Sequence, residues 1–187
     1  MNYLKNILPN VITLLNLSLG IIAILLTINN SNNNKETVNA LIYACLVIMV
    51  AAVTDRLDGK IARMLGTTSE LGKQLDSLSD LISFGVAPII ISWKICLMDF
   101  NIFGYLLAIL FPIAGAYRLA RFNTSEFSNV FTGMPITIAG AFLAIANLFN
   151  CISLINNRYT NLNSIITVIL IIILSFLMVS TFKIKKI

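Results

Sequence analysis

Four aspartates, Asp55, Asp58, Asp76 and Asp80, stand between long apolar segments of this 187-residue chain. They make up half of its eight acidic residues. A carboxylate at membrane depth costs at least about 2.5–3.5 kcal/mol, and clustered carboxylates also repel one another. One or two divalent cations would neutralise such a cluster. The four residues therefore predict a metal site, which points towards chemistry on phosphate.

The spacing divides the aspartates into two pairs. Asp55 and Asp58 are three residues apart, which is about 60° around a helix. Asp76 and Asp80 are four residues apart, which is about 40°. Each pair thus shares one helix face, and two helices can present four carboxylates to one cavity. Oxygen ligands of this kind suit Mg²⁺ or Mn²⁺, and a two-metal centre suits phosphoryl transfer.

Small residues accompany both pairs. Gly59 and Ala62 follow the first pair, and Gly72 precedes the second. Their size would let a phosphate or a flat base approach the backbone, although small residues also serve close helix packing in membranes. Arg63 shares the helix face of Asp55, where its guanidinium suits a phosphate oxygen. A cytoplasmic anchor is the alternative role for this arginine.

Composition excludes several classes of protein. The chain is 58% hydrophobic and only 11% charged, whereas soluble chains average about 25% charged residues. It has no histidine, so proton transfer falls to carboxylate, lysine, tyrosine or water. The spacing of the three cysteines indicates neither a metal site nor a disulfide. The net charge of +5 does not indicate nucleic-acid binding, because the basic residues lie at the ends of apolar runs.

About twenty apolar residues cross a bilayer as a helix, and six stretches reach that length. We expect a single all-α integral membrane domain over 1–187, with spans at roughly 8–29, 38–64, 72–98, 101–121, 131–153 and 162–182.

The basic residues set the expected orientation. Ten of them fall on one side of the expected spans: Lys5, Arg56, Lys60, Arg63, Lys73, Arg118, Arg121, Lys183, Lys185 and Lys186. Three fall on the other side: Lys35, Lys94 and Arg158. Cytoplasmic loops carry the excess of Lys and Arg. We therefore expect both termini and the aspartates at the cytoplasmic face of the cell membrane.

The run D-x2-D-G-x2-A-R-x8-G-x3-D-x3-D, from Asp55 to Asp80, resembles the signature of the CDP-alcohol phosphotransferase family, and all eight fixed positions are occupied. The resemblance covers the whole chain, because the family core is also six transmembrane helices. It implies transfer of a phospho-alcohol group from a CDP-linked donor to an acceptor hydroxyl, with release of CMP. It also implies two divalent metals held by the four aspartates, Asp80 as the base, and a homodimer.

Further stretches narrow the acceptor. LISFGVAP (81–88), YRLARFN (117–123) and FTGMPITIAG (131–140) are similar to the phosphatidylserine synthase branch of that family, as is PNVITLLNLSLG (9–20). The resemblance implies CDP-diacylglycerol, or its archaeal ether-lipid counterpart, as donor and L-serine as acceptor. The chain departs mildly from the branch pattern at three positions, and we expect none of them to touch the metal motif. They are Ile82, Met134 and Thr137.

An anionic group of the substrates would need a positively charged partner, and two arginines offer one. Arg118 and Arg121 share one helix face near the cytoplasmic end of the fourth span, where they suit a serine carboxylate or the lipid phosphate. Positive-inside anchoring is the alternative. Asn123 and Ser83 offer an amide and a hydroxyl to the same substrate.

A polar stripe marks the first span. Asn10, Thr13 and Asn16 follow one another at three-residue spacing. The stripe either faces the nucleotide, with Thr13 as a donor contact, or makes hydrogen bonds between helices.

Two other functions remain to be weighed. Glycerol 3-phosphate, inositol or inositol phosphate would share the aspartate motif with serine as acceptors. A cation transporter would also use carboxylates, but it predicts acidic residues on several spans and broken helices in repeated halves. The sequence has neither feature.

Overall fold

The computed structural model describes residues 2–29, 35–65, 69–124, 130–181 and 183–185, with the side chains of 2–9, 57–65, 130–132 and 183–185 outside the description. Six helices within these residues are long and apolar enough to cross a membrane, which confirms the expected number of apolar helices. A membrane protein is the class that fits them.

The elements follow one another with short connections. They are α1 (Asn2–Ile28), α2 (Lys35–Leu65), α3 (Glu70–Asp80), the π-helical segment η1 (Leu81–Val86), α4 (Ala87–Ile95), the short 3₁₀ turn η2 (Leu97–Phe100), α5 (Asn101–Thr124), β1 (Val130–Thr132), α6 (Ile136–Ile155), α7 (Asn161–Val179) and β2 (Lys183–Lys185). Three of them, α3, η1 and α4, run on as one continuous span.

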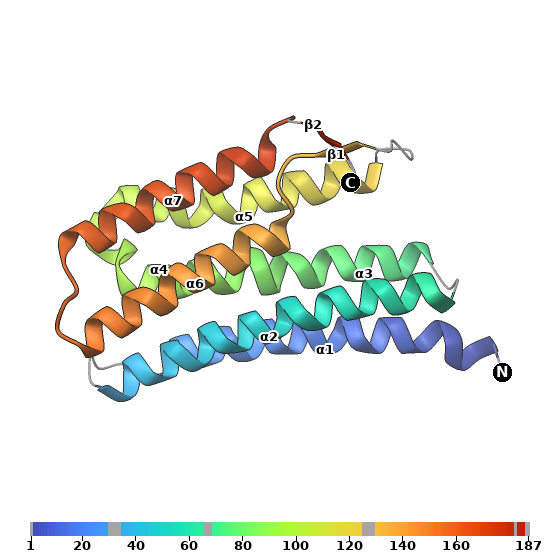
Figure 1. Ribbon diagram of the computed structural model, residues 1–187, viewed down its shortest axis with the longest axis horizontal. Helices are drawn as coiled ribbons and strands as arrows, with labels where there is room; N and C mark the ends of the chain where they lie inside the picture. The colour runs from blue at the N-terminus through green and yellow to red at the C-terminus, as the bar shows by residue number, and fades with distance from the viewer. Residues whose placement is uncertain (1, 30–34, 66–68, 125–129, 182, 186–187) are drawn as a thin grey trace.

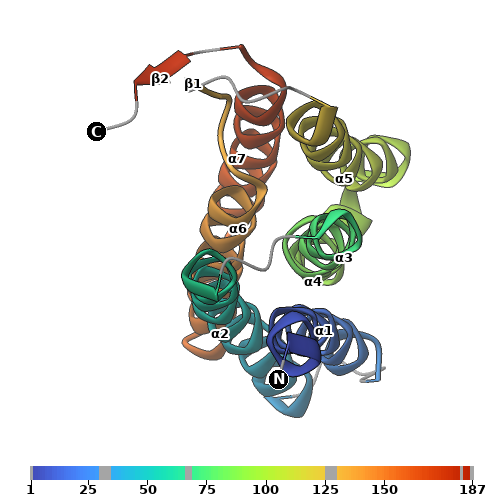
Figure 2. The same ribbon diagram turned by 90° about the vertical axis from the view of Figure 1, so that its right-hand side faces the viewer.

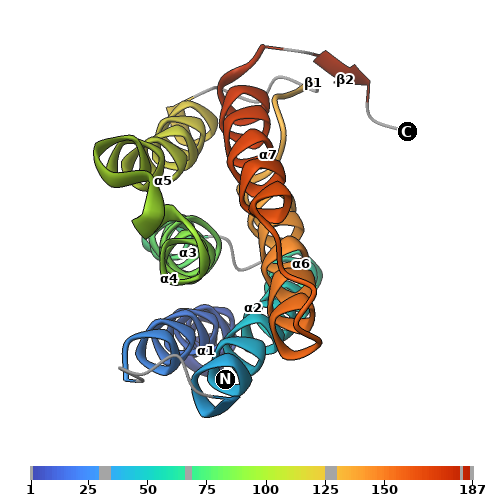
Figure 3. The ribbon, with the colours of Figure 1, turned by 90° about the vertical axis from the view of Figure 1, so that its left-hand side faces the viewer.

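Viewed from one end, the helices form a ring (Figure 2). Helix α1 packs along α2, α2 against α6, α6 against α7, and α7 against α5. The span made of α3, η1 and α4 contacts α1, α2, α5 and α6, and it is the most deeply buried of the six. The view from the other end shows the same order (Figure 3). This span, called the central span below, therefore packs against four of the other spanning helices.

The two ends of the bundle differ in the segments they hold. The start of α1, the end of α2, the start of α3, the end of α5 and the β1–β2 ribbon lie together at one end (Figure 1). The start of α2, the end of α4, the end of α6 and the start of α7 lie at the other. We call the first of these the terminal end.

The central span changes helix type directly after Asp80. From Leu81 to Val86 the backbone is π-helical, and the amide of Ala87 donates to the carbonyl of Ile82, five residues back. Pro88 explains the change, because a proline ring in an α-helix clashes with the carbonyl four residues before it. Short π-helical turns are frequent at functional sites, and this one begins at an aspartate of the metal motif.

Helix α6 is shaped to accept the π-helical segment. A Cβ on Gly140 would collide with the backbone carbonyl of Phe84, so the two helices touch backbone to backbone there. Further along, Asn147 donates to the carbonyl of Pro88 at 2.9 Å and accepts from the Ser92 hydroxyl at 2.9 Å. The side chains of Asn147 and Ser92 are both fully buried. The amide thereby satisfies a buried carbonyl and fixes the position of α4 along α6.

One expected boundary is wrong. The sequence predicts a helix over 131–153, but β1 occupies 130–132 and α6 begins only at Ile136. Gly133 has φ of +77°, and Pro135 precedes the first turn, so neither residue continues a helix backwards. Strand β1 pairs antiparallel with β2, which adds a small two-stranded ribbon to the expected all-α fold.

The contact between Gly140 and Phe84 can be tested by adding one methyl group. In an ordinary helix Gly→Ala is favourable by about 1 kcal/mol. Here we expect Gly140→Ala to destabilise the protein by about 1–3 kcal/mol, because backbone must move to admit the methyl group. Thermal unfolding in detergent measures this. Ala141→Ser, which also adds one heavy atom to α6 at a partly exposed position, should leave the midpoint unchanged. An unchanged or higher midpoint for Gly140→Ala would contradict the packing.

Candidate functional site

Three of the four motif aspartates meet between α2 and the central span. Asp55, Asp76 and Asp80 each place a carboxylate oxygen within 4.8 Å of the other two. Asp80 is buried, and the other two are half-buried. Residues from two helices thus converge on one point, as the paired spacing predicts.

Asp58 lies one helical turn after Asp55 on α2, whose backbone is helical as far as Leu65. Its side chain lies outside the description, and so do the surroundings of Gly59, Ala62 and Arg63. The predicted roles of these four residues stay predictions.

The donor set fits a hard divalent cation. Three carboxylates this close repel one another strongly in a partly buried site, where the effective dielectric constant is far below that of water. A cation that takes oxygen ligands relieves this repulsion, and Mg²⁺ and Mn²⁺ are cations of that kind. The cluster can therefore hold at least one metal ion.

Helix α6 also reaches the cluster. The hydroxyl of Thr137 donates a hydrogen bond to Asp55 Oδ2 at 3.3 Å. The expectation that Thr137 does not touch the metal motif is therefore wrong. The contact depends on where α6 begins, which hydropathy does not reveal. The start of a helix carries partial positive charge, which favours a neighbouring carboxylate.

The central span is also bonded to α1. The hydroxyl of Ser79 donates to the carbonyl of Thr13 at 3.1 Å, and that of Ser83 donates to the carbonyl of Asn16 at 3.0 Å. Ser79 lies three residues after Asp76, and Ser83 lies three residues after Asp80. They tie the central span to α1, so the polar stripe of the first span borders this interface.

Gly72 lies at the start of α3, as predicted. Its amide donates to the Ser69 hydroxyl at 3.0 Å, which caps the helix. A Cβ on Gly72 would lie 3.0 Å from the amide oxygen of Asn10 on α1. The glycine therefore permits a close approach between α1 and α3.

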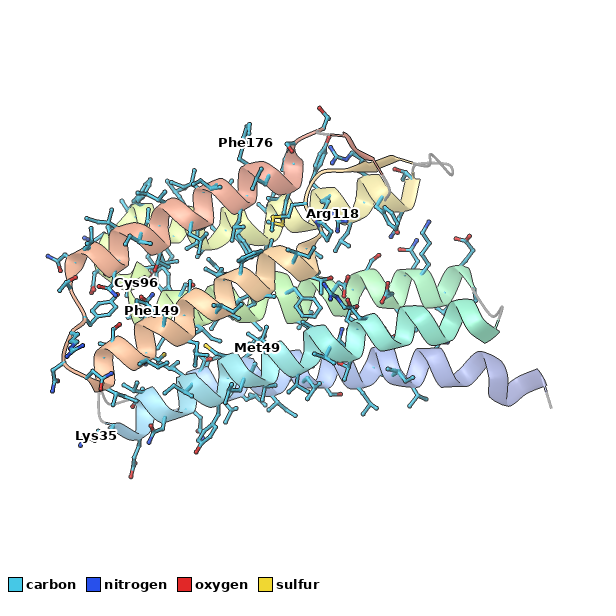
Figure 4. The ribbon with its side chains drawn as sticks, viewed as in Figure 1. Lys35, Met49, Cys96, Arg118, Phe149 and Phe176 are labelled. Carbon is cyan, nitrogen blue, oxygen red and sulfur yellow. The ribbon has the colours of Figure 1, made fainter. Side chains whose placement is uncertain are left out.

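The two candidate arginines have different surroundings. Arg118 lies on α5 in the half nearest the terminal end (Figure 4). Its side chain is 8% exposed, and its charge interacts with Asp80. The Nε atom has no hydrogen-bond partner within the described residues. A buried guanidinium with an unused donor is available to an anion.

Arg121 is bonded to the end of α7. Its guanidinium donates to the carbonyl of Val179 at 2.9 Å and to that of Ser180 at 3.1 Å. Val179 is the last residue of α7 and Ser180 is its C-cap, so their carbonyls have no partner within the helix.

Asn123 joins α5 to α3. Its side-chain NH₂ group donates to the Ser77 hydroxyl at 2.9 Å. Its backbone carbonyl accepts a hydrogen bond from the Lys73 ammonium at 3.1 Å. The side-chain oxygen of Asn123, Oδ1, is buried and has no hydrogen-bond partner in the described part of the chain. The predicted contacts of Asn123, Ser83 and Thr13 with substrates are not tested by this geometry.

Comparison with known proteins adds a family and relatives. A family model described as CDP-alcohol phosphatidyltransferase matches residues 6–182. A protein of Methanocaldococcus jannaschii named CDP-diacylglycerol–serine O-phosphatidyltransferase is 38% identical over 175 residues, which are 94% of this chain and 72% of that protein.

Two further relatives are longer than this chain. The archaetidylserine synthase of Methanothermobacter thermautotrophicus is 40% identical over 136 residues, covering 71% of this chain and 54% of the relative. A CDP-diacylglycerol–serine O-phosphatidyltransferase of Helicobacter pylori is 38% identical over 121 residues, covering 63% and 48%. The chain thus spans about half the length of these two relatives.

Removing one charge from the cluster tests its need for a cation. We expect Asp76→Asn to raise the thermal midpoint in EDTA by about 3 °C or more, because it relieves repulsion worth about 1 kcal/mol or more. The same variant should lose most of the stabilisation that Mn²⁺ gives the unaltered protein. Asp99→Asn, at an exposed position outside the cluster, should do neither. Equal Mn²⁺ stabilisation of Asp76→Asn would contradict a cation site here.

Proposed function

Since the chain belongs to the CDP-alcohol phosphatidyltransferase family, we propose that it transfers the phospholipid moiety of a CDP-linked lipid to the hydroxyl of L-serine and releases CMP. The donor is CDP-diacylglycerol or its archaeal ether counterpart, and the product is a phosphatidylserine-type lipid. The cluster of Asp55, Asp76 and Asp80 carries this proposal, because it supplies the ligands that the reaction needs. The printed names of the relatives support serine as the acceptor.

The four aspartates are proposed to hold two divalent cations, Mg²⁺ or Mn²⁺. When bound, such cations supply positive charge to the phosphates of the donor and to the departing CMP. In this proposal two ligands, Asp55 and Asp58, come from α2, and two, Asp76 and Asp80, come from α3. Small residues beside them leave room for the nucleotide, and Arg63 and Thr13 are its proposed partners, with Gly59, Ala62 and Gly72 as the close-approach positions.

Asp80 is the proposed base. The serine oxygen forms a bond to the lipid-linked phosphorus, the bond from that phosphorus to the CMP oxygen breaks, and the serine proton passes to the carboxylate. The chain has no histidine to take that proton. Asp80 is the most buried of the three described aspartates and lies deepest along the central span. It directly precedes the π-helical segment, which sets the direction of the span beyond it.

Arg118 is the proposed partner of the serine carboxylate. It is buried near Asp80 and has an unused Nε donor in the described structure. A serine held there by its carboxylate presents its hydroxyl towards the base. Arg121 shares the helix face in sequence, but its guanidinium bonds the end of α7. We therefore assign the substrate carboxylate to Arg118, with Asn123 and Ser83 as further contacts of the acceptor or the lipid phosphate.

The site is proposed to lie at the cytoplasmic face of the cell membrane, in a homodimer. Helix α2 has 31 residues and is about 46 Å long, whereas the hydrocarbon core is about 30 Å thick. Asp55 lies about 30 Å along this helix from Lys35, so the aspartates stand near the boundary of the membrane. The excess of Lys and Arg at the terminal end supports the cytoplasmic assignment.

An acceptor screen tests the proposal. Purified protein with Mn²⁺ or Mg²⁺, CDP-diacylglycerol and labelled serine should give labelled phospholipid and CMP in equal amounts. Asp80→Asn is the control and should lower turnover at least about 100-fold, because it removes the base. CMP release that requires glycerol 3-phosphate, inositol or inositol phosphate instead would make the serine assignment wrong and leave the family unchanged.

Truncating Arg118 tests the carboxylate contact. We expect Arg118→Ala to raise the KM for serine about tenfold or more, because a charge-assisted hydrogen bond is lost. The KM for the CDP-lipid should change little. Arg158→Ala, at an exposed position on the other end of the bundle, should change neither constant. An effect on the KM for the CDP-lipid alone would move Arg118 to the lipid phosphate.

A further inference from the structure

We propose that Thr137 is a positioning residue of the metal centre, whose hydroxyl holds the Asp55 carboxylate in the orientation that binds the cation. The inference rests on the proposed function, because it requires that the aspartates bind metal. It adds a residue from a third helix, α6, to a centre that the sequence motif confines to α2 and α3.

The direction of the Thr137 hydroxyl is unusual for this protein. Three other threonine hydroxyls in the described helices, those of Thr27, Thr54 and Thr124, donate to a carbonyl of their own helix three or four residues back. Thr137 instead donates across to Asp55 Oδ2 on α2. The cause is its position as the second residue of α6, since the residues three and four before it are not helical. The hydroxyl is therefore directed out of its own helix.

The start of α6 is held in place by the end of α7. The amide of Met134 donates to the carbonyl of Leu177 at 3.1 Å. Gly133, with φ of +77°, fits so closely that a Cβ would lie 2.8 Å from the carbonyl oxygens of Met178 and Ser180 and 3.1 Å from the guanidinium of Arg121. Arg121 itself bonds the end of α7. Thr137 thus projects from a backbone that is fixed on the side away from Asp55.

A neutral donor suits this position. A hydroxyl orients a carboxylate without cancelling its negative charge, so the full charge remains for the cation. An arginine or lysine at the same place would orient it but would also compete with the metal. Partners of metal ligands commonly change metal affinity by about 10–100-fold when they are removed.

Binding of Mn²⁺ to the purified protein, followed by electron paramagnetic resonance without substrates, tests the inference. We expect Thr137→Val, which keeps the shape and loses the donor, to bind Mn²⁺ about tenfold more weakly. Thr137→Ser keeps the donor and should bind within about twofold of the unaltered protein. Thr54→Val is the matched control beside Asp55, because its hydroxyl bonds its own helix, and it should bind Mn²⁺ normally.

Each outcome decides the inference. Thermal midpoints in EDTA that agree between Thr137→Val and the unaltered protein, together with weaker Mn²⁺ binding, support it. Equal or tighter Mn²⁺ binding by Thr137→Val overturns it and leaves the proposed function intact. If Thr137→Val does not fold, Thr137→Ala replaces it with the same expectation. Failure of the unaltered protein to bind Mn²⁺ overturns both the inference and the proposed metal centre.

Discussion

The repulsion among Asp55, Asp76 and Asp80 is the constraint on which the rest of this structure depends. Three carboxylates within 4.8 Å of one another would separate if the helices that carry them were free to move. The fold prevents this by packing. The central span is held by contacts with α1, α5 and α6, and α2 packs against both α1 and α6. A divalent cation bound among these carboxylates would relieve their repulsion.

The central span shows how backbone irregularity serves this purpose. A proline eight residues after Asp80 widens the helix into a π-helical segment, and Gly140 on α6 provides the space for it. Asn147 then takes the carbonyl of Pro88 at 2.9 Å. Serine hydroxyls on the other side bond carbonyls of α1. The aspartates are thus borne on a helix that is fixed by specific polar contacts, in a membrane setting where apolar packing alone gives little orientation.

Much of this arrangement can be predicted from the sequence, because helical periodicity alone pairs the aspartates and hydropathy alone counts the spans. The remainder depends on tertiary structure. The stretch LISFGVAP predicts an unbroken apolar helix, and its hydropathy does not predict the π-helical segment. The stretch FTGMP is apolar enough to extend a span, although Gly133 and Pro135 stop one. Arg118 and Arg121 share a face by spacing, and only the position of the α7 end separates their roles. Thr137 meets Asp55 because α6 begins where it does.

The contacts at the end of α7 have a consequence for the order of assembly. Within the described structure, the partners on that side of the start of α6 are Leu177 for Met134 and Val179 and Ser180 for Arg121, all in α7 or at its C-cap. The aspartates emerge from the ribosome about a hundred residues earlier. The two acidic helices, α2 and α3, are therefore synthesised before the helix that holds the start of α6 in place. A defect in α7 would therefore reach the aspartate cluster, because α7 holds the start of the helix whose Thr137 bonds Asp55.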